Sequence, residues 1–159
     1  MSCNSGSSAA CGISDNAGAS NDLSCDSGSI RLRPHHLLCI QKFTGHGYDE
    51  MFTAFMTKLV LRLRTMPNEE VFLISGCDDL CTACPNNING NCSSLQKVGA
   101  MDRKVLSSCG LSAKASARWL DLVSLAKEKV LDGTAFYEIC GECQWFELCK
   151  NTSKGFYDE

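Results

Sequence analysis

Apolar residues recur at helical spacing in three stretches of the chain. A period near 3.6 residues is typical of an amphipathic helix that buries one face. The first stretch, 48–66, repeats Tyr48, Met51, Phe52, Phe55, Met56, Leu59, Val60, Leu63 and Met66. The second, 94–106, repeats Leu95, Val98, Met101, Val105 and Leu106, and the third, 113–131, repeats Trp119, Leu122, Val123, Ala126 and Val130. Three helices are therefore predicted.

Start and stop signals define the ends of these helices. Pro67 follows the first stretch, Gly110 follows the second, and Asp132 with Gly133 follows the third. Glycine and proline are common just beyond a helix end. Ser112 is a good N-cap for the third helix because its hydroxyl can accept from a free backbone N–H.

Three shorter segments complete the fold prediction. Residues 31–45 favour a short helix with Pro34 in its first turn, and 134–150 favour one or two helical turns. The segment 69–75, EEVFLIS, is the one plausible strand. We therefore predict a mainly α protein, a small helical domain with cysteine-bearing loops and at most one or two short strands.

Composition divides the chain into a tail and one domain. The first 29 residues hold nine Ser, four Gly, three Asn and three Asp, with no aromatic residue. Such a segment cannot bury a core, so 1–29 is predicted to be a disordered tail and 30–159 a single cysteine-rich metal-binding domain. The three tail Asp account for the net charge of -3. The domain is therefore balanced in charge, and nucleic acid is not expected as a partner.

The twelve cysteines indicate metal or redox chemistry. No basic segment followed by an apolar run opens the chain, and no run of about 18 apolar residues occurs. We therefore expect a cytoplasmic protein without a membrane partner. Stable disulfides are rare in a reducing cytosol, so this number of thiols favours ligands over disulfides.

Seven of the cysteines form two groups with ligand-like spacing. The first group is Cys77-x3-Cys81-x2-Cys84-x7-Cys92, and the second is Cys140-x2-Cys143-x5-Cys149. Two residues between thiols let a tight turn direct both sulfurs to one site, as zinc and iron-sulfur sites both require. Two such pairs, each with a third cysteine nearby, are much stronger evidence for a metal than one pair.

The number of thiols leaves the metal open. Adding Cys39 gives eight thiolates, enough for two [4Fe-4S] clusters, ligated by Cys39, Cys77, Cys81, Cys84, Cys92, Cys140, Cys143 and Cys149. Alternatively, one zinc ion would take two C-x2-C pairs, Cys81, Cys84, Cys140 and Cys143. Pro85 after Cys84 favours iron, because proline follows a ligand cysteine in ferredoxin motifs. Trp145 and Phe146 would either shield a cluster or pack in the core.

Other cysteines and histidines are weaker ligand candidates. His35 and His36 precede Cys39 by four and three residues, so on a helix they could supply a ligand or a proton relay. Cys109 is expected to be a buried free thiol, with a reserve role as a fourth ligand for the terminal group. Cys3, Cys11 and Cys25 lie in the predicted tail and are not expected to be ligands.

Four motifs, RPHHLLC, GHGYDEMF, DDLCTACP with Cys92, and CGECQWFELC, together resemble a family of small bacterial and archaeal proteins. It is catalogued as domain of unknown function number 1284, and its members are thought to bind an iron-sulfur cluster. The resemblance spans residues 31–150. The matching positions are His35, His36, Cys39, Cys81, Cys84, Cys92, Cys140, Cys143 and Cys149. Without Cys77 seven thiolates remain, enough for one cluster of four and a spare trio, or for two sites if a histidine contributes.

Three functional hypotheses follow. The leading one is an iron-sulfur protein with one or two [4Fe-4S] clusters, serving electron transfer or redox sensing with an unknown redox protein partner, and not an enzyme by itself. The second is a structural zinc module that presents a helical surface to another protein. The third is an enzyme in which His35, His36 and an incompletely ligated cluster form the active site.

Overall fold

The computed structural model describes residues 28–158. The predicted tail, apart from Gly28 and Ser29, lies outside the described residues, as do Cys3, Cys11 and Cys25. The mainly α class is confirmed. The helices are α1 (His36–Gln41), α2 (Glu50–Thr65), α3 (Leu95–Cys109), α4 (Trp119–Ala126), α5 (Ala135–Cys140) and α6 (Phe146–Lys150), with a 3-10 turn, η1 (Leu80–Ala83), and a π-helical turn, η2 (Lys127–Leu131).

The strands are more numerous than the one or two expected. A three-stranded sheet has the order β1 (Ile30–Leu32), β2 (Glu70–Leu73) and β5 (Ser116–Arg118), with β1 parallel and β5 antiparallel to β2. A hairpin of β3 (Asn87–Ile88) and β4 (Asn91–Cys92) carries the end of the cysteine loop. Strands of two or three residues are too short to show a period-2 pattern, so the sequence predicted only β2.

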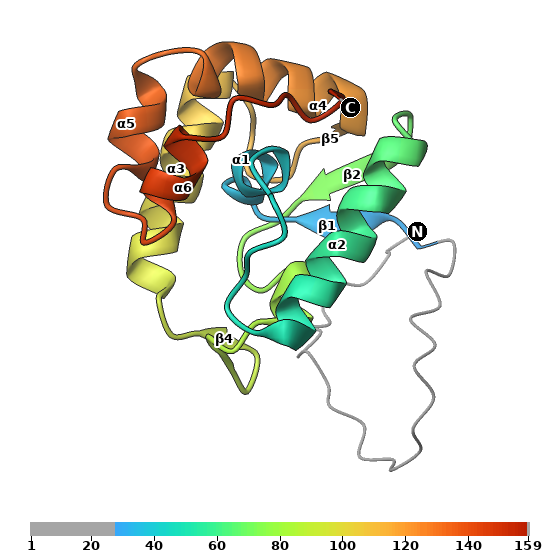
Figure 1. The fold of residues 1–159 in the computed structure, drawn as a ribbon, viewed down its shortest axis with the longest axis vertical. Coiled ribbons are helices and arrows are strands. Elements are labelled where there is room, and N and C mark those ends of the chain that lie inside the picture. The colour runs from blue at the N-terminus through green and yellow to red at the C-terminus, as the bar shows by residue number, and fades with distance from the viewer. Residues whose placement is uncertain (1–27, 159) are drawn as a thin grey trace, which may run out of the picture.

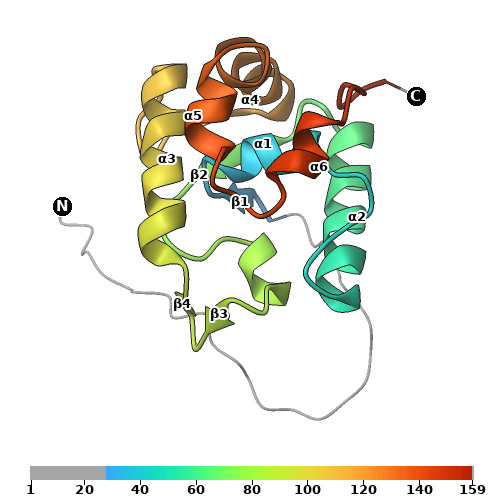
Figure 2. The ribbon, with the colours of Figure 1, turned by 60° about the vertical axis from the view of Figure 1, so that its left-hand side comes forward.

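Helix α1 lies at the centre of the molecule, between the sheet and the C-terminal helices (Figures 1 and 2). Its Leu37, Leu38 and Ile40 are almost fully buried, as are Leu32 and Leu73 of the sheet. Helices α2 and α3 stand on opposite sides of this centre, and η1, β3 and β4 lie between their lower ends (Figure 2). The core therefore fixes α1 close to both cysteine groups.

Helices α2 and α3 end at the predicted signals, just before Pro67 and at Gly110, whereas the cap at the start of α2 was not predicted. The side chain of Asp49 accepts from the N–H of Phe52 at 2.7 Å, which caps the start of α2. Helix α3 ends at Gly110, whose φ of +63° is the left-handed conformation that glycine adopts without strain.

The predicted helix 113–131 is wrong in its first part. Residues 116–118 form β5, and the helix begins at Trp119 instead of after an N-cap at Ser112. The reason is tertiary: β2 offers a free edge, and Leu73 N donates to Ala115 O while Trp119 N donates to Glu69 O, both at 2.8 Å. These ladder bonds outweigh a weak local preference for helix. Among residues 28–158, none of the helices is long and apolar enough to cross a bilayer.

Candidate metal centre

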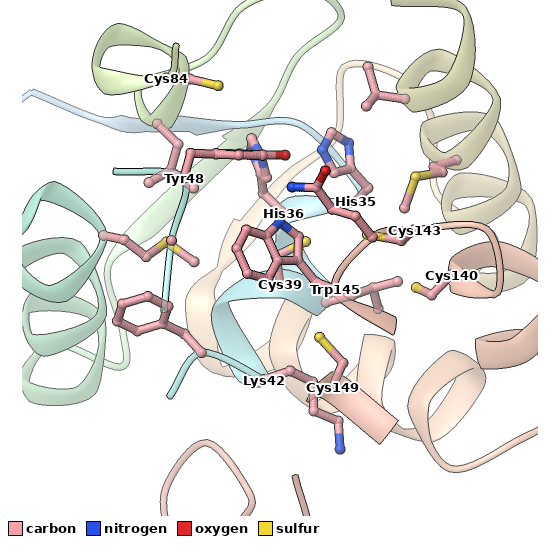
Figure 3. A pocket seen from close by; sticks show the side chains of 18 of the residues that line it. His35, His36, Cys39, Lys42, Tyr48, Cys84, Cys140, Cys143, Trp145 and Cys149 are labelled. Carbon is pink, nitrogen blue, oxygen red and sulfur yellow. The ribbon is translucent and has the colours of Figure 1, made fainter. Parts of the chain in front are cut away.

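Most of the cysteines in the described part of the chain line one cavity of about 320 Å³ (Figure 3). Residues 28–158 contain nine cysteines, all free, and seven of them line this cavity. They are Cys39, Cys81, Cys84, Cys92, Cys140, Cys143 and Cys149. Histidines 35 and 36 line it as well. Groups that lie 50 residues apart in the sequence therefore face one space.

Three of these cysteines, Cys81, Cys84 and Cys92, form what we call the loop trio. Cys84 N donates to Cys81 O at 3.1 Å, so the C-x2-C segment is a tight turn. The β3–β4 hairpin then reverses the chain and returns Cys92 to the cavity. Its turn uses Asn89 and Gly90, with φ of +52° and +82°, values that asparagine and glycine tolerate best.

The other four, Cys39, Cys140, Cys143 and Cys149, form the four-thiol set. Cys143 N donates to Cys140 O at 2.8 Å, which makes the turn between α5 and α6, and Cys149 lies on α6. Cys39 joins them from α1. Burial raises the pKa of Cys39 well above its ordinary value, and the charges that Cys140, Cys143 and Cys149 would carry raise it further.

Burial also raises the pKa of Cys140, to about 12, with Cys143 and Cys149 adding to the rise. Thiols in such a group do not ionise together at neutral pH without a compensating positive charge. A bound metal supplies that charge and displaces the protons.

Two cysteines lie outside the cavity. The Sγ of Cys77 donates to Gly90 O at 3.2 Å, and Cys77 does not line the cavity, although the sequence offered it as the eighth ligand. Cys109 is buried in the core at the end of α3, as expected of a small apolar thiol. The structure therefore brings together seven of the eight cysteines proposed from the sequence.

Both histidines of the RPHHLLC segment are held by buried carboxylates. His35 Nδ1 lies 2.6 Å from Asp102 Oδ1, and His36 Nδ1 lies 2.5 Å from Asp78 Oδ2. A carboxylate can only accept, so each Nδ1 carries a proton, and Nε2 is the ring nitrogen that a neutral imidazole would offer to a metal. Metal-ligating histidines have this carboxylate arrangement.

The two carboxylates remain ionised. Burial acts to raise the pKa of Asp78, but the charge of His36, with hydrogen bonds from His36 and Arg33 N, lowers it to about 2. The hydrogen bond and charge of His35 likewise overcome burial and lower the pKa of Asp102. Neither aspartate was predicted as part of the site. Asp102 could have been found as a carboxylate next to Met101 on the apolar face of α3.

Arg33 contributes a buried donor without an acceptor. Its Nε and Nη2 contact Asp102 Oδ2 at 2.8 and 2.7 Å, while Nη1 has no hydrogen-bond partner among residues 28–158. Arg33 is 2% exposed and lines the cavity. Leaving a buried donor unsatisfied costs about 1–3 kcal/mol. The unpaired Nη1 therefore indicates that the cavity accommodates a group that can accept a hydrogen bond.

An aromatic pair closes part of the cavity wall. Tyr48 and Trp145 both line the cavity, and their ring centroids are 5.6 Å apart in an edge-on contact. Phe146 packs against the core beside Phe136, with centroids 5.4 Å apart. Phe146 also lines the cavity, so it both extends the core and borders the thiols, whereas Trp145 borders the thiols.

The cavity is lined by seven thiols and by the imidazoles of His35, His36 and His46, which are suitable donors for zinc or for an iron-sulfur cluster. Within residues 28–158, no group of three or more His, Cys, Asp or Glu side chains is arranged to hold a metal ion as it stands. The sulfurs instead border an open volume, and Figure 3 shows Cys84 and the terminal cysteines on opposite sides of the two imidazoles. The donor set and the unsatisfied Arg33 Nη1 fit an anionic group that fills the volume.

Comparison with protein families gives one match. The model of the family described as "Protein of unknown function (DUF1284)" matches residues 47–149, more than half of the chain. The chain belongs to this DUF1284 family. The match includes the loop trio and the three terminal cysteines, whereas His35, His36 and Cys39 lie before it. No curated protein and no solved structure matches the chain.

Proposed function

We propose that this chain is an iron-sulfur protein that binds a [4Fe-4S] cluster at the four-thiol set and serves electron transfer or redox sensing. The proposal rests on one observation: Cys39 lines the same cavity as Cys140, Cys143 and Cys149 and is close enough for their charges to act on it. Four thiolates are the usual ligand set of a [4Fe-4S] cluster.

The volume of the cavity supports a cluster over a zinc ion. In a tetrahedral zinc site four sulfurs lie about 2.3 Å from one ion, so no space is left between them. Here the four thiols line part of a cavity of about 320 Å³ that the loop trio lines as well. A cluster of eight iron and sulfur atoms needs such a space, and a single ion does not.

The chain would position and shield the group. When bound, the cluster supplies one-electron chemistry. The turn at Cys140–Cys143 and helix α1 bring their thiols to the same cavity, and Tyr48 with Trp145 would limit the access of water. Lys42 lies near Cys149 and lowers the pKa of that thiol, against the dominant rise from burial and that from Cys143. Positive charge near the thiolates favours the anionic cluster.

The test is the iron, sulfide and zinc content per chain after purification without oxygen. We expect acid-labile sulfide and iron in equal amounts, and their loss from the four-thiol set in Cys39→Ser and in Cys140→Ser. Cys77→Ser is the matched control, because Cys77 is half-buried but outside the cavity. A colourless protein with stoichiometric zinc and no sulfide would contradict the proposal.

A further inference from the structure

We propose that the loop trio holds a second iron-sulfur centre, distinct from the one at the four-thiol set, and that His36 Nε2 is its fourth protein ligand. This inference rests on the proposed function. Binding would be a ligand exchange in which an intact cluster passes from a thiolate-ligated donor to the loop trio. The three thiols become thiolates, their three protons pass to the thiolates of the donor, and iron and sulfur keep their oxidation states.

The three thiols of the loop trio lie on a segment that is built to present them. Asn87 Nδ2 donates to Cys81 O at 2.9 Å, and Gly90 N donates to Asn87 Oδ1 at 2.9 Å. Asn87 therefore connects the C-x2-C turn to the hairpin turn that precedes Cys92. This local network holds the three cysteines of the loop trio relative to one another and includes no residue of the four-thiol set.

Asp78 ties His36 to the loop trio. One carboxylate oxygen, Oδ2, lies 2.5 Å from His36 Nδ1, while the other, Oδ1, accepts from Cys81 N at 3.1 Å. Asp78 is 2% exposed. The carboxylate thus orients the imidazole and the first ligand turn together, as a carboxylate behind a ligand histidine does in metal sites.

The fourth ligand is assigned to His36 because the other nearby donors are engaged elsewhere. Cys77 Sγ donates to Gly90 O and lies outside the cavity. His35 is instead held on α3, because its backbone N–H and its Nδ1 both pair with Asp102 Oδ1. His36 remains as the cavity-lining donor whose supporting carboxylate also contacts the loop trio.

Arg33 provides a second, independent indication that an anionic group binds here. Its guanidinium lies close enough to Cys81 and Cys92 for their charges to act on it. Nη1 is buried without a partner among residues 28–158, and Arg33 lines the same cavity as Cys81 and Cys92. A cluster held by three thiolates would offer sulfur acceptors to that N–H.

The experiment measures iron and sulfide per chain in anaerobic full-length protein, with electron paramagnetic resonance spectra of the reduced state. We expect two clusters in the wild type, and one in the double variant Cys81→Ser, Cys84→Ser. His36→Gln keeps a donor for Asp78 but removes the ligand, so the loop centre should be lost or should bind iron at least 10-fold more weakly. His36→Cys should restore it.

The controls are built into the same chain. The cluster at the four-thiol set reports whether a variant has folded, and His46→Gln changes a third cavity-lining histidine that is held by Thr44 instead of a carboxylate. His46→Gln and Cys77→Ser should keep both clusters. The inference is overturned if wild type holds a single cluster that survives loss of Cys81 and Cys84, or if His36→Gln keeps both with unchanged spectra. In that case the first centre stands; a protein with neither iron nor sulfide would overturn both proposals.

Discussion

His36 Nδ1 lies 2.5 Å from Asp78 Oδ2, and this contact joins the central helix α1 to the cysteine loop. The same carboxylate accepts from Arg33 N at 2.6 Å and from Cys81 N at 3.1 Å. Three segments therefore converge on one buried charge. Its removal should disturb the fold and the thiol geometry together.

Asp78→Asn should destabilise the protein by about 2–4 kcal/mol, because the amide replaces an acceptor with a donor and leaves a buried donor unpaired. Urea unfolding of the metal-free protein measures the loss. We also expect weaker iron retention by the loop trio. Asp79→Asn is the control, since Asp79 pairs with the exposed Arg31, and its cost should be under about 1 kcal/mol. Equal costs for the two variants would contradict the central role of Asp78.

Stability of the metal-free protein should fall as the pH is lowered from about 6.5 to about 4. Burial, and next the charge of His36, lower the pKa of His35 from its ordinary 6.5 to about 4, against the effects of Asp102 and Asp78. As the pH falls, the unfolded chain protonates His35 at a higher pH than the folded chain does. The contribution of His35 to the free energy of unfolding is therefore complete above pH 6.5 and is lost toward pH 4. The largest loss is about 3 kcal/mol.

Urea unfolding at a series of pH values tests this dependence. Arg33 stays charged throughout, and Asp78, with its pKa at about 2, keeps its charge through this window. His35→Gln should therefore flatten the profile between pH 4 and 6.5. A variant whose stability falls with the wild-type slope would show that another group is responsible.

Gly141→Ala should disrupt the four-thiol set. A Cβ at this position would lie 2.5 Å from Tyr137 O, a backbone atom that cannot move without unwinding α5. We expect a loss of about 1–3 kcal/mol and a fall in iron bound through Cys140 and Cys143. Gly133→Ala is the matched change, because its nearest atom, Val130 O, is 4.0 Å away. Iron content and urea unfolding of both variants distinguish local crowding from a general effect of alanine.

Trp145→Ala should make the bound cluster more sensitive to air. Trp145 borders the cavity beside Tyr48, and its removal would admit water and oxygen to the sulfurs. The decay of the visible absorption after exposure to air gives the rate, which we expect to rise several-fold. Tyr137→Ala removes an exposed ring that does not line the cavity and should leave the rate unchanged. Identical decay in the two variants would assign Trp145 no shielding role.

Local pattern predicted the parts of the fold that depend on near neighbours. The apolar period of 48–66 and the glycine at 110 led to α2 and α3, which the structure has at Glu50–Thr65 and Leu95–Cys109. The two C-x2-C pairs were visible as turns, and both are closed by a backbone hydrogen bond. Helical period and tight turns involve residues within a few positions of one another, so the sequence carries their signal directly.

Contacts between distant segments could not be predicted in this way. The segment 116–118 became a strand only because β2, which lies far earlier in the chain, offered a pairing edge; Val71, for example, pairs with Ala117. The two aspartates behind the histidines had no spacing that linked them to 35 and 36. Such pairings depend on how the elements pack, which a one-dimensional pattern does not record.

The sequence by itself determined the ligand types and the two local cysteine groups. Tertiary structure decided their grouping: burial of Leu37, Leu38 and Ile40 places α1 at the centre of the core, and this brings Cys39 to the terminal cysteines. It also left Cys77 outside the cavity and linked His36 to the loop trio through Asp78. Spacing limits which thiols can share a turn, whereas the packing of the core decides which turns face each other.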